Sequence, residues 1–426
     1  MLYDIGFLIF SLFYLPALLF KGKLHGDFSE RFGVYSAEKR SSLERSKGAI
    51  WIQAVSVGEV ALLKSFIPLL RQRYPSTPIV LSTITSSGND LARRLFSKDA
   101  VIIYFPLDFS FIVKRVLDLV RPRLYVMVET EIWPNFLRRV SASSIPAALI
   151  NGRISDRSFG KYRLARPFIK DILARIDSFC MQSDVDACRI ISLGAPKNKV
   201  TVTGSMKFDI TASFDEKGAS YLRSCLGLAS GDELLVAGST HRGEEEIIAD
   251  LFSELKMEFP FLRLLIAPRH IERAGEVESA VKRSGLIPMR VSCLNEQRRT
   301  LNEQRIFILD IIGCLSDAYM IAALVFVGGS LVKHGGQNPI EPAALGKPVI
   351  FGPHMFNFKN IAEALLKGEG AVQVNDADGL KEAFRIFLKD SARRKTFGNN
   401  ALDVIKRNRG ATRKNLEALE KLIADS

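Results

Sequence analysis

The chain has 426 residues, of which 47% are hydrophobic and 25% are charged, and its formal net charge is +13. This length exceeds one ordinary hydrophobic core, so two domains are expected, and the composition excludes a disordered chain. The basic charge suits an anionic membrane or a phosphorylated substrate; no zinc-finger spacing, aromatic RNA-binding motif or long Lys/Arg block favours nucleic acid. Five scattered cysteines without a Cys-x-x-Cys pair favour a reducing compartment, the cytoplasm.

The N-terminal segment is uncharged and apolar from Ile5 to Phe20, and Lys21 and Lys23 follow it. A membrane-spanning helix needs about 20 apolar residues, so this run is short for a span, and no clear signal-peptide cleavage site follows it. The basic flank favours the cytoplasmic side. We expect residues 1–22 to form a membrane anchor or an interfacial helix; the alternative is an apolar helix packed on a domain.

Short apolar strands then alternate with longer amphipathic stretches in two successive series. The first series of expected strands is Ile50–Ala54, Ile79–Ser82, Val101–Phe105, Leu124–Val128, Ala147–Ile150, Ser178–Met181 and Val200–Thr203. The second series is Leu234–Gly238, Leu262–Ala267, Ile306–Leu309, Leu324–Val327, Pro348–Phe351 and Ala371–Val374. This alternation is typical of parallel sheets with helices on both faces.

The chain is therefore predicted to be an α/β protein with two Rossmann-like domains that face a cleft. We assign residues 23–208 to the N-terminal domain, residues 209–231 to a polar, helical linker and residues 232–426 to the C-terminal domain. Ligands are expected at the carboxyl ends of the strands. The near-duplicated segment 294–305 lacks an apolar face and is expected to be an exposed loop.

Charged residues follow three of the strands expected in the N-terminal domain. Glu59 begins the helix after the first strand, where its carboxylate suits a general base or only favours the helix N-terminus electrostatically. Glu129 and Glu131 emerge from the fourth strand beside Trp133, and Lys207 follows the last strand. Carboxylates and a lysine that converge at strand ends indicate a catalytic arrangement, although each alone is an ordinary solvated charge.

Glycine-rich and basic turns follow the strands of the C-terminal domain. The segment from His334 leads through glycines into a helix, a pattern that lets backbone amides approach a phosphate; the alternative is a tight turn without a ligand. Arg269 leaves a buried strand, and its guanidinium suits a phosphate or a base. Gly313 allows close backbone approach in another strand-end turn. His241 is either a ligand contact or a bystander.

Six motifs follow one another along essentially the whole chain: Ala-Val-Ser-Val-Gly-Glu59, Glu129-Thr-Glu-Ile-Trp-Pro, Gly204-Ser-Met-Lys-Phe-Asp, Gly238-Ser-Thr-His-Arg-Gly-Glu, Ala267-Pro-Arg-His and Gly335-Gly-Gln-Asn-Pro-Ile-Glu-Pro. Together and in this order they resemble the motifs of the 3-deoxy-D-manno-octulosonic acid (Kdo) transferases of Gram-negative lipopolysaccharide assembly.

The resemblance implies a glycosyltransferase of the two-domain GT-B type that moves Kdo from CMP-Kdo to the glucosamine disaccharide of a lipid A precursor. It implies that Glu59 is the base and that Glu129 and Lys207 stabilise the transition state. The positions that match CMP contacts are Pro268, Arg269, Ile312, Gly313, Cys314, Asn338, Pro339, Ile340 and Glu341. The family usually has Met-Gly-Glu where this chain has Ile312-Gly313-Cys314, so one carboxylate contact is missing.

The expected partners are CMP-Kdo, the lipid A precursor and the anionic cytoplasmic face of the inner membrane, without nucleic acid. No metal or other cofactor is expected, because the single phosphate of CMP carries less charge than a diphosphate. Five basic residues are candidates for contact with lipid headgroups, or form only a solvated basic loop: Arg153, Arg157, Lys161, Arg163 and Arg166. Alternative functions are a UDP-sugar-dependent lipid glycosyltransferase, a sugar-nucleotide 2-epimerase and a non-catalytic membrane-associated binding protein.

Overall fold

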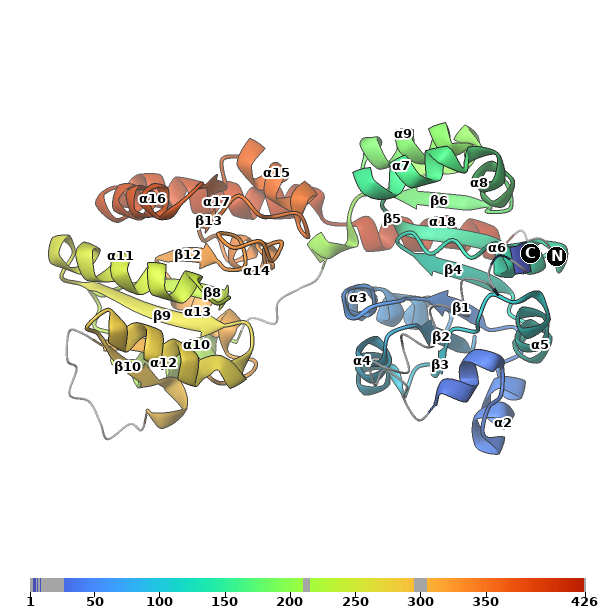
Figure 1. The fold of residues 1–426 in the computed structure, drawn as a ribbon, viewed down its shortest axis with the longest axis horizontal. Coiled ribbons are helices and arrows are strands. Elements are labelled where there is room, and N and C mark those ends of the chain that lie inside the picture. Colours follow the sequence, from blue (N-terminus) through green and yellow to red (C-terminus); the bar gives the residue numbers. More distant parts are fainter. Residues whose placement is uncertain are drawn as a thin grey trace. The chain divides into compact units, whose positions relative to one another are not determined.

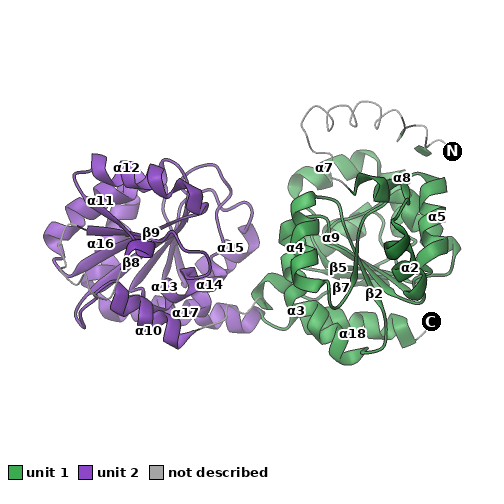
Figure 2. Ribbon diagram, turned by 90° about the horizontal axis from the view of Figure 1, so that it is seen from below, with its two compact units in different colours: residues 1–210, 409–426 green, residues 211–408 purple. Residues whose placement is uncertain are grey.

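The computed structural model describes residues 3, 4, 6, 8, 27–209, 215–294 and 305–424 (Figure 1). The chain divides into two compact units: unit 1 comprises residues 1–210 and 409–426, and unit 2 comprises residues 211–408 (Figure 2). Most of the predicted anchor and of the segment 294–305 lies outside the described residues. Among the helices that are described, none has both the length and the apolar character needed to cross a bilayer.

Unit 1 is built on a parallel sheet of seven strands in the order β3-β2-β1-β4-β5-β6-β7. The strands are β1 (Ile50–Gln53), β2 (Ile79–Thr83), β3 (Val101–Tyr104), β4 (Leu124–Val128), β5 (Ala147–Gly152), β6 (Ser178–Met181) and β7 (Val200–Val202). Unit 2 has a second parallel sheet of seven strands in the order β10-β11-β9-β8-β12-β13-β14. These strands are β8 (Glu233–Thr240), β9 (Leu262–Pro268), β10 (Ile287–Arg290), β11 (Arg305–Ile308), β12 (Leu324–Val327), β13 (Val349–Phe351) and β14 (Ala371–Gln373). The prediction of two parallel α/β sheets is confirmed.

Helices cover both faces of the sheet in unit 1. They are η1 (Phe28–Phe32), α2 (Ala37–Arg45), α3 (Val57–Arg73), α4 (Ser86–Phe96), α5 (Ser110–Val120), α6 (Pro134–Ala142), α7 (Asp156–Leu164), α8 (Arg166–Leu173), α9 (Asp184–Leu193), η2 (Lys197–Lys199), η3 (Met206–Asp209) and α18 (Ala411–Ala424). Alternate side chains of β1 pack against the helices on opposite faces of the sheet. Trp51 packs with α5 and α6, whereas Ile50 and Ile52 pack with α3, α4 and α18. A strand buried on both faces in this way reads as a continuous apolar run, which is why it was recognisable in the sequence.

The helical segments of unit 2 flank its sheet in the same manner. They are α10 (Glu216–Cys225), α11 (Glu244–Glu258), η4 (Ile271–Arg273), α12 (Ala274–Arg283), η5 (Val291–Cys293), α13 (Leu315–Ile321), α14 (Ile340–Ala344), α15 (Lys359–Lys367), α16 (Ala377–Lys389) and α17 (Ser391–Asn408). Strand β10 was not predicted. It lies at the edge of the sheet, contains Pro288 and is only partly buried, so it lacks the apolar pattern of an interior strand.

The end of the chain returns to unit 1, whereas the sequence analysis placed all of residues 232–426 in the second domain. Leu416, Leu419 and Ile423 of α18 belong to the hydrophobic core around β1. The carboxylate of Asp209 accepts hydrogen bonds from the backbone N–H groups of Gly410 and Thr412, both at 2.6 Å. The apolar face of α18 is thus buried against the unit 1 sheet. Within the predicted linker, α10 is part of unit 2 and packs on α13. A cleft between the domains stays a prediction.

Candidate functional site

The strand order of unit 1 reverses between β1 and β4, since β2 and β3 lie on one side of β1 and β4 to β7 on the other. In open α/β sheets, ligands bind at the carboxyl ends of the strands beside such a reversal. Glu59 lies in the first turn of α3, directly after β1, and Glu129 and Glu131 directly follow β4. The structure therefore brings the predicted carboxylates to the reversal point of this sheet.

The side chain of Glu59 is 8% exposed and is held by its own helix N-terminus. Its Oε2 accepts from the backbone N–H of Val55 at 2.7 Å, and its Oε1 accepts from Ser56 Oγ at 3.0 Å. Burial raises the pKa of Glu59 to about 7 and the charge of Glu129 adds to this, while the two hydrogen bonds oppose it. The capping role is thus present, and so is a proton affinity suited to a base at neutral pH.

A second carboxyl group interacts with Glu59. Burial raises the pKa of Glu131 to about 8, and the charge of Glu59 adds to the effect. Trp133 Nε1 donates to Glu131 Oε2 at 3.0 Å. Between them in the chain, Glu129 has a φ of +62°, a left-handed conformation that is uncommon for a residue with a side chain. Such conformations often occur at ligand sites, where the surrounding fold holds a strained turn in place.

Lys207 lies in η3, after the last strand of the same sheet. Burial lowers the pKa of Lys207; the charge of Glu129 opposes the shift and that of Arg153 adds to it. The three residues predicted to be catalytic, Glu59, Glu129 and Lys207, thus all follow strands of the unit 1 sheet, and their roles stay predictions.

In unit 2 the strand order reverses between β8 and β12. One buried carboxylate forms hydrogen bonds with the turn after β8 and with the turn after β12. Glu244, in the first turn of α11, accepts with Oε1 from the backbone N–H groups of Ser330 and Leu331 at 2.9 and 3.0 Å. Its Oε2 accepts from those of Gly329 and His241 at 2.7 and 2.9 Å. The sequence analysis did not assign this residue, because a glutamate at a helix start is usually explained by the helix alone.

Gly328 allows the ends of β8 and β12 to approach each other. A Cβ atom at this position would lie 2.5 Å from the backbone oxygen of Ser239 and 2.6 Å from the Cα of Thr240. Any larger residue would therefore push the β12 turn away from β8. The glycine and the Glu244 carboxylate together set the backbone that leads into the predicted nucleotide-binding motif at Asn338.

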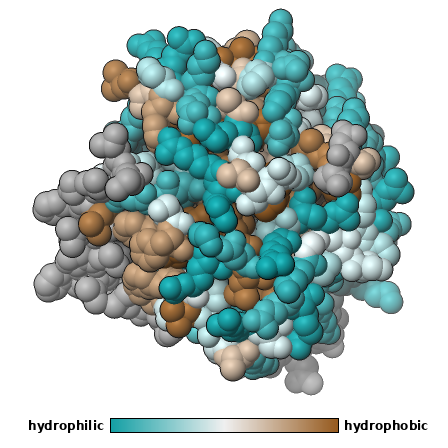
Figure 3. Space-filling model, turned by 90° about the vertical axis from the view of Figure 1, so that its right-hand side faces the viewer, coloured by the Kyte–Doolittle hydropathy of each residue, from teal (hydrophilic) through white to brown (hydrophobic). Residues whose placement is uncertain are grey.

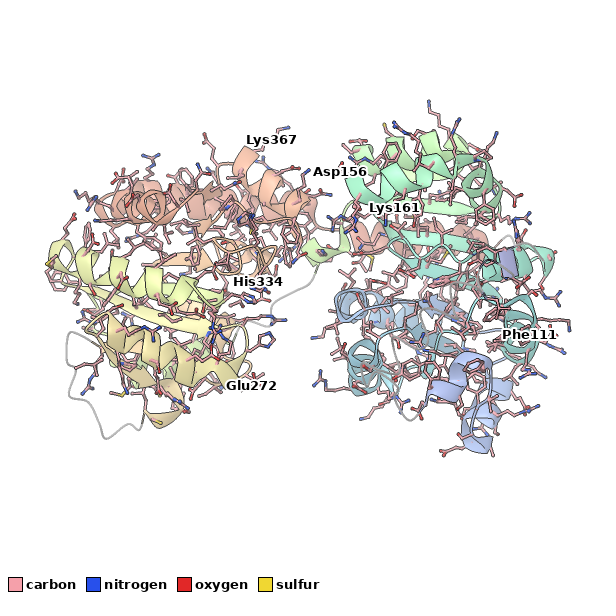
Figure 4. The ribbon with its side chains drawn as sticks, viewed as in Figure 1. Phe111, Asp156, Lys161, Glu272, His334 and Lys367 are labelled. Atoms are coloured by element: carbon pink, nitrogen blue, oxygen red, sulfur yellow. The ribbon has the colours of Figure 1, made fainter. Side chains whose placement is uncertain are left out.

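Three histidines gather at the carboxyl ends of these strands. The ring of His241 stacks on that of His334 at 4.2 Å between centroids (Figure 4 labels His334) and stands edge-on to that of His270 at 6.4 Å. Burial lowers the pKa of His241 to about 4, and the nearby His334, Arg273, His270 and Arg269 add to the effect. Gln337 Nε2 lies 3.0 Å from His241 Nε2, so the amide donates to the unprotonated ring nitrogen. Since His241 is neutral at pH 7, the positive charge that would attract an anionic ligand here comes from the nearby Arg269 and Arg273.

The residues predicted to contact CMP lie on three turns of the same unit. Pro268 ends β9, and the backbone N–H of Arg269 donates to Thr240 O at 3.0 Å. The side chain of Asn338 forms hydrogen bonds with residues that follow it in the same turn. Its Nδ2 donates to Glu341 Oε1 at 3.1 Å, and its Oδ1 accepts from the backbone N–H of Ile340 at 3.0 Å.

The other predicted positions differ in what they offer a ligand. Pro339 is the N-cap of α14, and the side chain of Ile340 is buried, so these two positions offer mainly their backbone. Ile312 is 80% exposed. Gly313 has a φ of +96°, which a residue with a side chain adopts at a cost. Cys314 is the N-cap of α13.

Comparisons with known proteins identify the family. A family model for 3-deoxy-D-manno-octulosonic-acid transferase matches residues 26–210. The chain is 35% identical over 395 residues to the 3-deoxy-D-manno-octulosonic acid transferase of Haemophilus influenzae, covering 92% of this chain and 90% of that protein. It is 33% identical over 368 residues to the protein of the same name from Chlamydophila psittaci, covering 86% and 83%.

Solved structures support the fold alone. A glycosyltransferase from Rickettsia africae matches with a TM-score of 0.60 and 13% identity over 89% of this chain and 100% of that one. A UDP-GlcNAc 2-epimerase from Neisseria meningitidis matches with a TM-score of 0.58 and 13% identity over 88% and 100%. Since both activities occur on this fold, the sequence relatives decide between them. With 35% identity along nearly its whole length to one such enzyme, this chain belongs to the 3-deoxy-D-manno-octulosonic acid transferase family.

Proposed function

We propose that this protein transfers Kdo from CMP-Kdo to a sugar hydroxyl of a lipid A precursor, with Glu59 as the general base. The observation that carries the proposal is the buried Glu59 carboxyl at the reversal point of the unit 1 sheet, with a pKa of about 7, in a member of the Kdo transferase family. Families of this kind share a fold with epimerases, so the site chemistry must account for a transfer.

The transfer forms a bond between the acceptor oxygen and the anomeric carbon of Kdo, and breaks the bond from that carbon to the phosphate oxygen of CMP. The acceptor hydroxyl loses its proton, and the electron pair of the broken bond leaves with CMP. A carboxylate with a pKa near 7 accepts this proton efficiently at neutral pH. Positive charge develops at the anomeric carbon, and we propose that Glu129 and Lys207 balance the charges that form there.

Arg269 in unit 2 is proposed to bind the phosphate of CMP, close to the three histidines. Replacing Arg269 with Ala is expected to weaken CMP binding about 30-fold, because a lost charge-assisted hydrogen bond costs about 2 kcal/mol. Isothermal titration of CMP into the full-length protein measures this. Arg242→Ala is the matched control, since the Arg242 side chain is 80% exposed and pairs with Glu276. Equal CMP affinity in both variants would remove Arg269 from the site.

The acceptor is proposed to reach the protein at an anionic membrane surface. In unit 1, Leu164 is 88% exposed and Phe168 is 37% exposed. Helix α7, which ends at Leu164, also carries Arg157, Lys161 and Arg163 (Lys161 is labelled in Figure 4). Figure 3 shows apolar side chains grouped among hydrophilic ones on one face. Such a mixture suits lipid headgroups, where each basic residue contributes about 1 kcal/mol.

The proposal is tested by mass spectrometry of the product formed from CMP-Kdo, generated in place, and a tetraacyl lipid A precursor. We expect product with CMP-Kdo and none with UDP-sugars, higher rates in anionic than in zwitterionic vesicles, and no loss of activity with EDTA. Use of a UDP-sugar would sink the donor assignment. Turnover of a sugar nucleotide without any acceptor would favour the epimerase instead. CMP binding without transfer would show that the acceptor is wrong.

A further inference from the structure

Asn151 lies near the end of β5 and is fully buried. Neither the sequence motifs nor the family assignment gave this residue a role. Its φ of +51° is left-handed, which asparagine tolerates better than most residues. Its backbone N–H donates to Asn415 Oδ1 at 3.2 Å, and its carbonyl accepts from Gln182 Nε2 at 2.9 Å. The backbone of this residue is thus fixed from two sides, and the direction of its side chain is fixed with it.

The side chain of Asn151 holds the turn that carries Lys207. Its Oδ1 accepts from the backbone N–H of Met206 at 2.9 Å, and Met206 is the first residue of η3, immediately before Lys207. A backbone N–H can only donate, so this bond settles which end of the amide is oxygen. On the other side, the backbone N–H of Glu129 donates to the carbonyl of Ile150, the residue before Asn151, at 3.0 Å. Asn151 therefore links the two chain segments that bear Glu129 and Lys207.

The opposite end of the same amide is unusual. Asn151 Nδ2 is buried and has no hydrogen-bond partner among the residues that the structure describes. An unpaired buried donor costs about 1–3 kcal/mol, so an amide at this position is not explained by stability alone. Only the oxygen of the Asn151 side chain makes a hydrogen bond, and its partner is the backbone N–H of Met206, next to Lys207.

We propose that Asn151 is a positioning residue: through Met206 it fixes the backbone of the turn that carries Lys207. The inference rests on the proposed function for its catalytic consequence, and on the hydrogen-bond network alone for its effect on Lys207. Asn151 itself is buried and acts through Lys207, without contact to the substrate.

Asn151→Gly is the informative substitution, because glycine adopts a φ of +51° without strain and only the side chain is lost. The expected kcat falls about 100-fold, the loss that a displacement near 1 Å produces, with both KM values within about threefold of wild type. The pKa of Lys207, read from the pH dependence of competitive acetylation and mass spectrometry, should rise toward the ordinary lysine value as the turn loosens and the ammonium gains water.

Asn89→Ala is the matched control. Asn89 is also a buried amide of unit 1 but lies outside this network, and its Nδ2 donates to Thr83 Oγ1 at 2.9 Å. It should lower Tm and leave kcat per folded molecule and the Lys207 titration unchanged. If both variants lose activity only in proportion to their folded fraction, or if Lys207 titrates in Asn151→Gly as in wild type, the positioning role is refuted. Should wild type fail to transfer Kdo, the proposed function falls, while the Lys207 titration still decides the positioning role.

Discussion

Glu59→Gln is expected to lower kcat for Kdo transfer about 1,000-fold and to leave CMP affinity unchanged. A general base contributes about 10²–10⁴ to a rate, and glutamine has nearly the shape of glutamate but cannot take a proton at neutral pH. Glu59 lies in unit 1, whereas the residues proposed for CMP lie in unit 2, so donor binding is a separate measurement. Steady-state kinetics with CMP titration on the same preparation tests both halves of the expectation.

The pH dependence follows from the pKa of Glu59, which is raised from 4.5 to about 7. The base works only when deprotonated, so kcat/KM of the wild type should rise with pH and level off above about 7. Because the folded-state pKa is raised, the stability that this group contributes is present below pH 4.5 and is lost as pH rises through 7. At pH 8, Glu59→Gln should therefore unfold with a free energy higher by up to about 3 kcal/mol.

Glu38→Gln is the matched control, since Glu38 also lies in the first turn of a unit 1 helix but is exposed. It should change neither the rate nor the pH profile. A Glu59→Gln enzyme that keeps more than about a tenth of wild-type kcat would mean that another group takes the proton. Glu131, whose pKa is raised to about 8, would be the next residue to replace.

Glu244→Gln is expected to be the most destabilising isosteric change in unit 2, by about 3–5 kcal/mol. Each carboxylate oxygen of Glu244 accepts two backbone N–H groups. The amide nitrogen of glutamine cannot accept, so two buried N–H groups lose their partner at about 1–3 kcal/mol each. The burial that raises the pKa of Glu244 is relieved in the neutral amide and offsets part of this loss. Urea unfolding of the full chain and hydrogen exchange at Gly329, Ser330 and Leu331 measure the loss.

CMP affinity should fall together with this exchange protection, since the same turn leads to Asn338. Glu246→Gln serves as the comparison: its side chain is 38% exposed and pairs with Arg283 at the surface, a pair worth less than about 1 kcal/mol. Similar stability in the two variants would mean that the β12 turn keeps its conformation without the Glu244 carboxylate.

The fold was largely predictable because interior strands of parallel sheets are apolar on both faces. Leu124–Val128 and Leu324–Val327 occupy the positions that the sequence indicated. The edge strand β10 and the placement of α18 were not predictable in this way, since neither depends on a local pattern. The charged helix α18 looks like its neighbour α17 in sequence, and only the burial of Leu419 and Ile423 in the unit 1 core separates them.

The sequence indicated charged residues at strand ends: Glu129 and Arg269 directly follow a strand, whereas Glu59 and Lys207 lie in the helical turn after one, and their roles stay predictions. Glu244 and Asn151 were missed because their function lies in hydrogen bonds to backbone groups that are distant in the chain, which no spacing reveals. Stacking of His241 on His334 depends likewise on the close approach of two turns. Motif reasoning therefore indicated charged side chains near strand ends and overlooked the residues that hold the neighbouring turns.

The return of α18 to unit 1 determines the order in which the protein can be completed during synthesis. Residues 211–408 are continuous, so unit 2 has its whole sequence outside the ribosome before unit 1 does. Domains fold as units while the chain emerges, and the unit with Glu59 is completed last. A chain released before residue 409 would leave the apolar layer around Ile50 and Ile52 without its covering helix. A chain without α18 would therefore expose apolar surface of the kind that chaperones and proteases recognise.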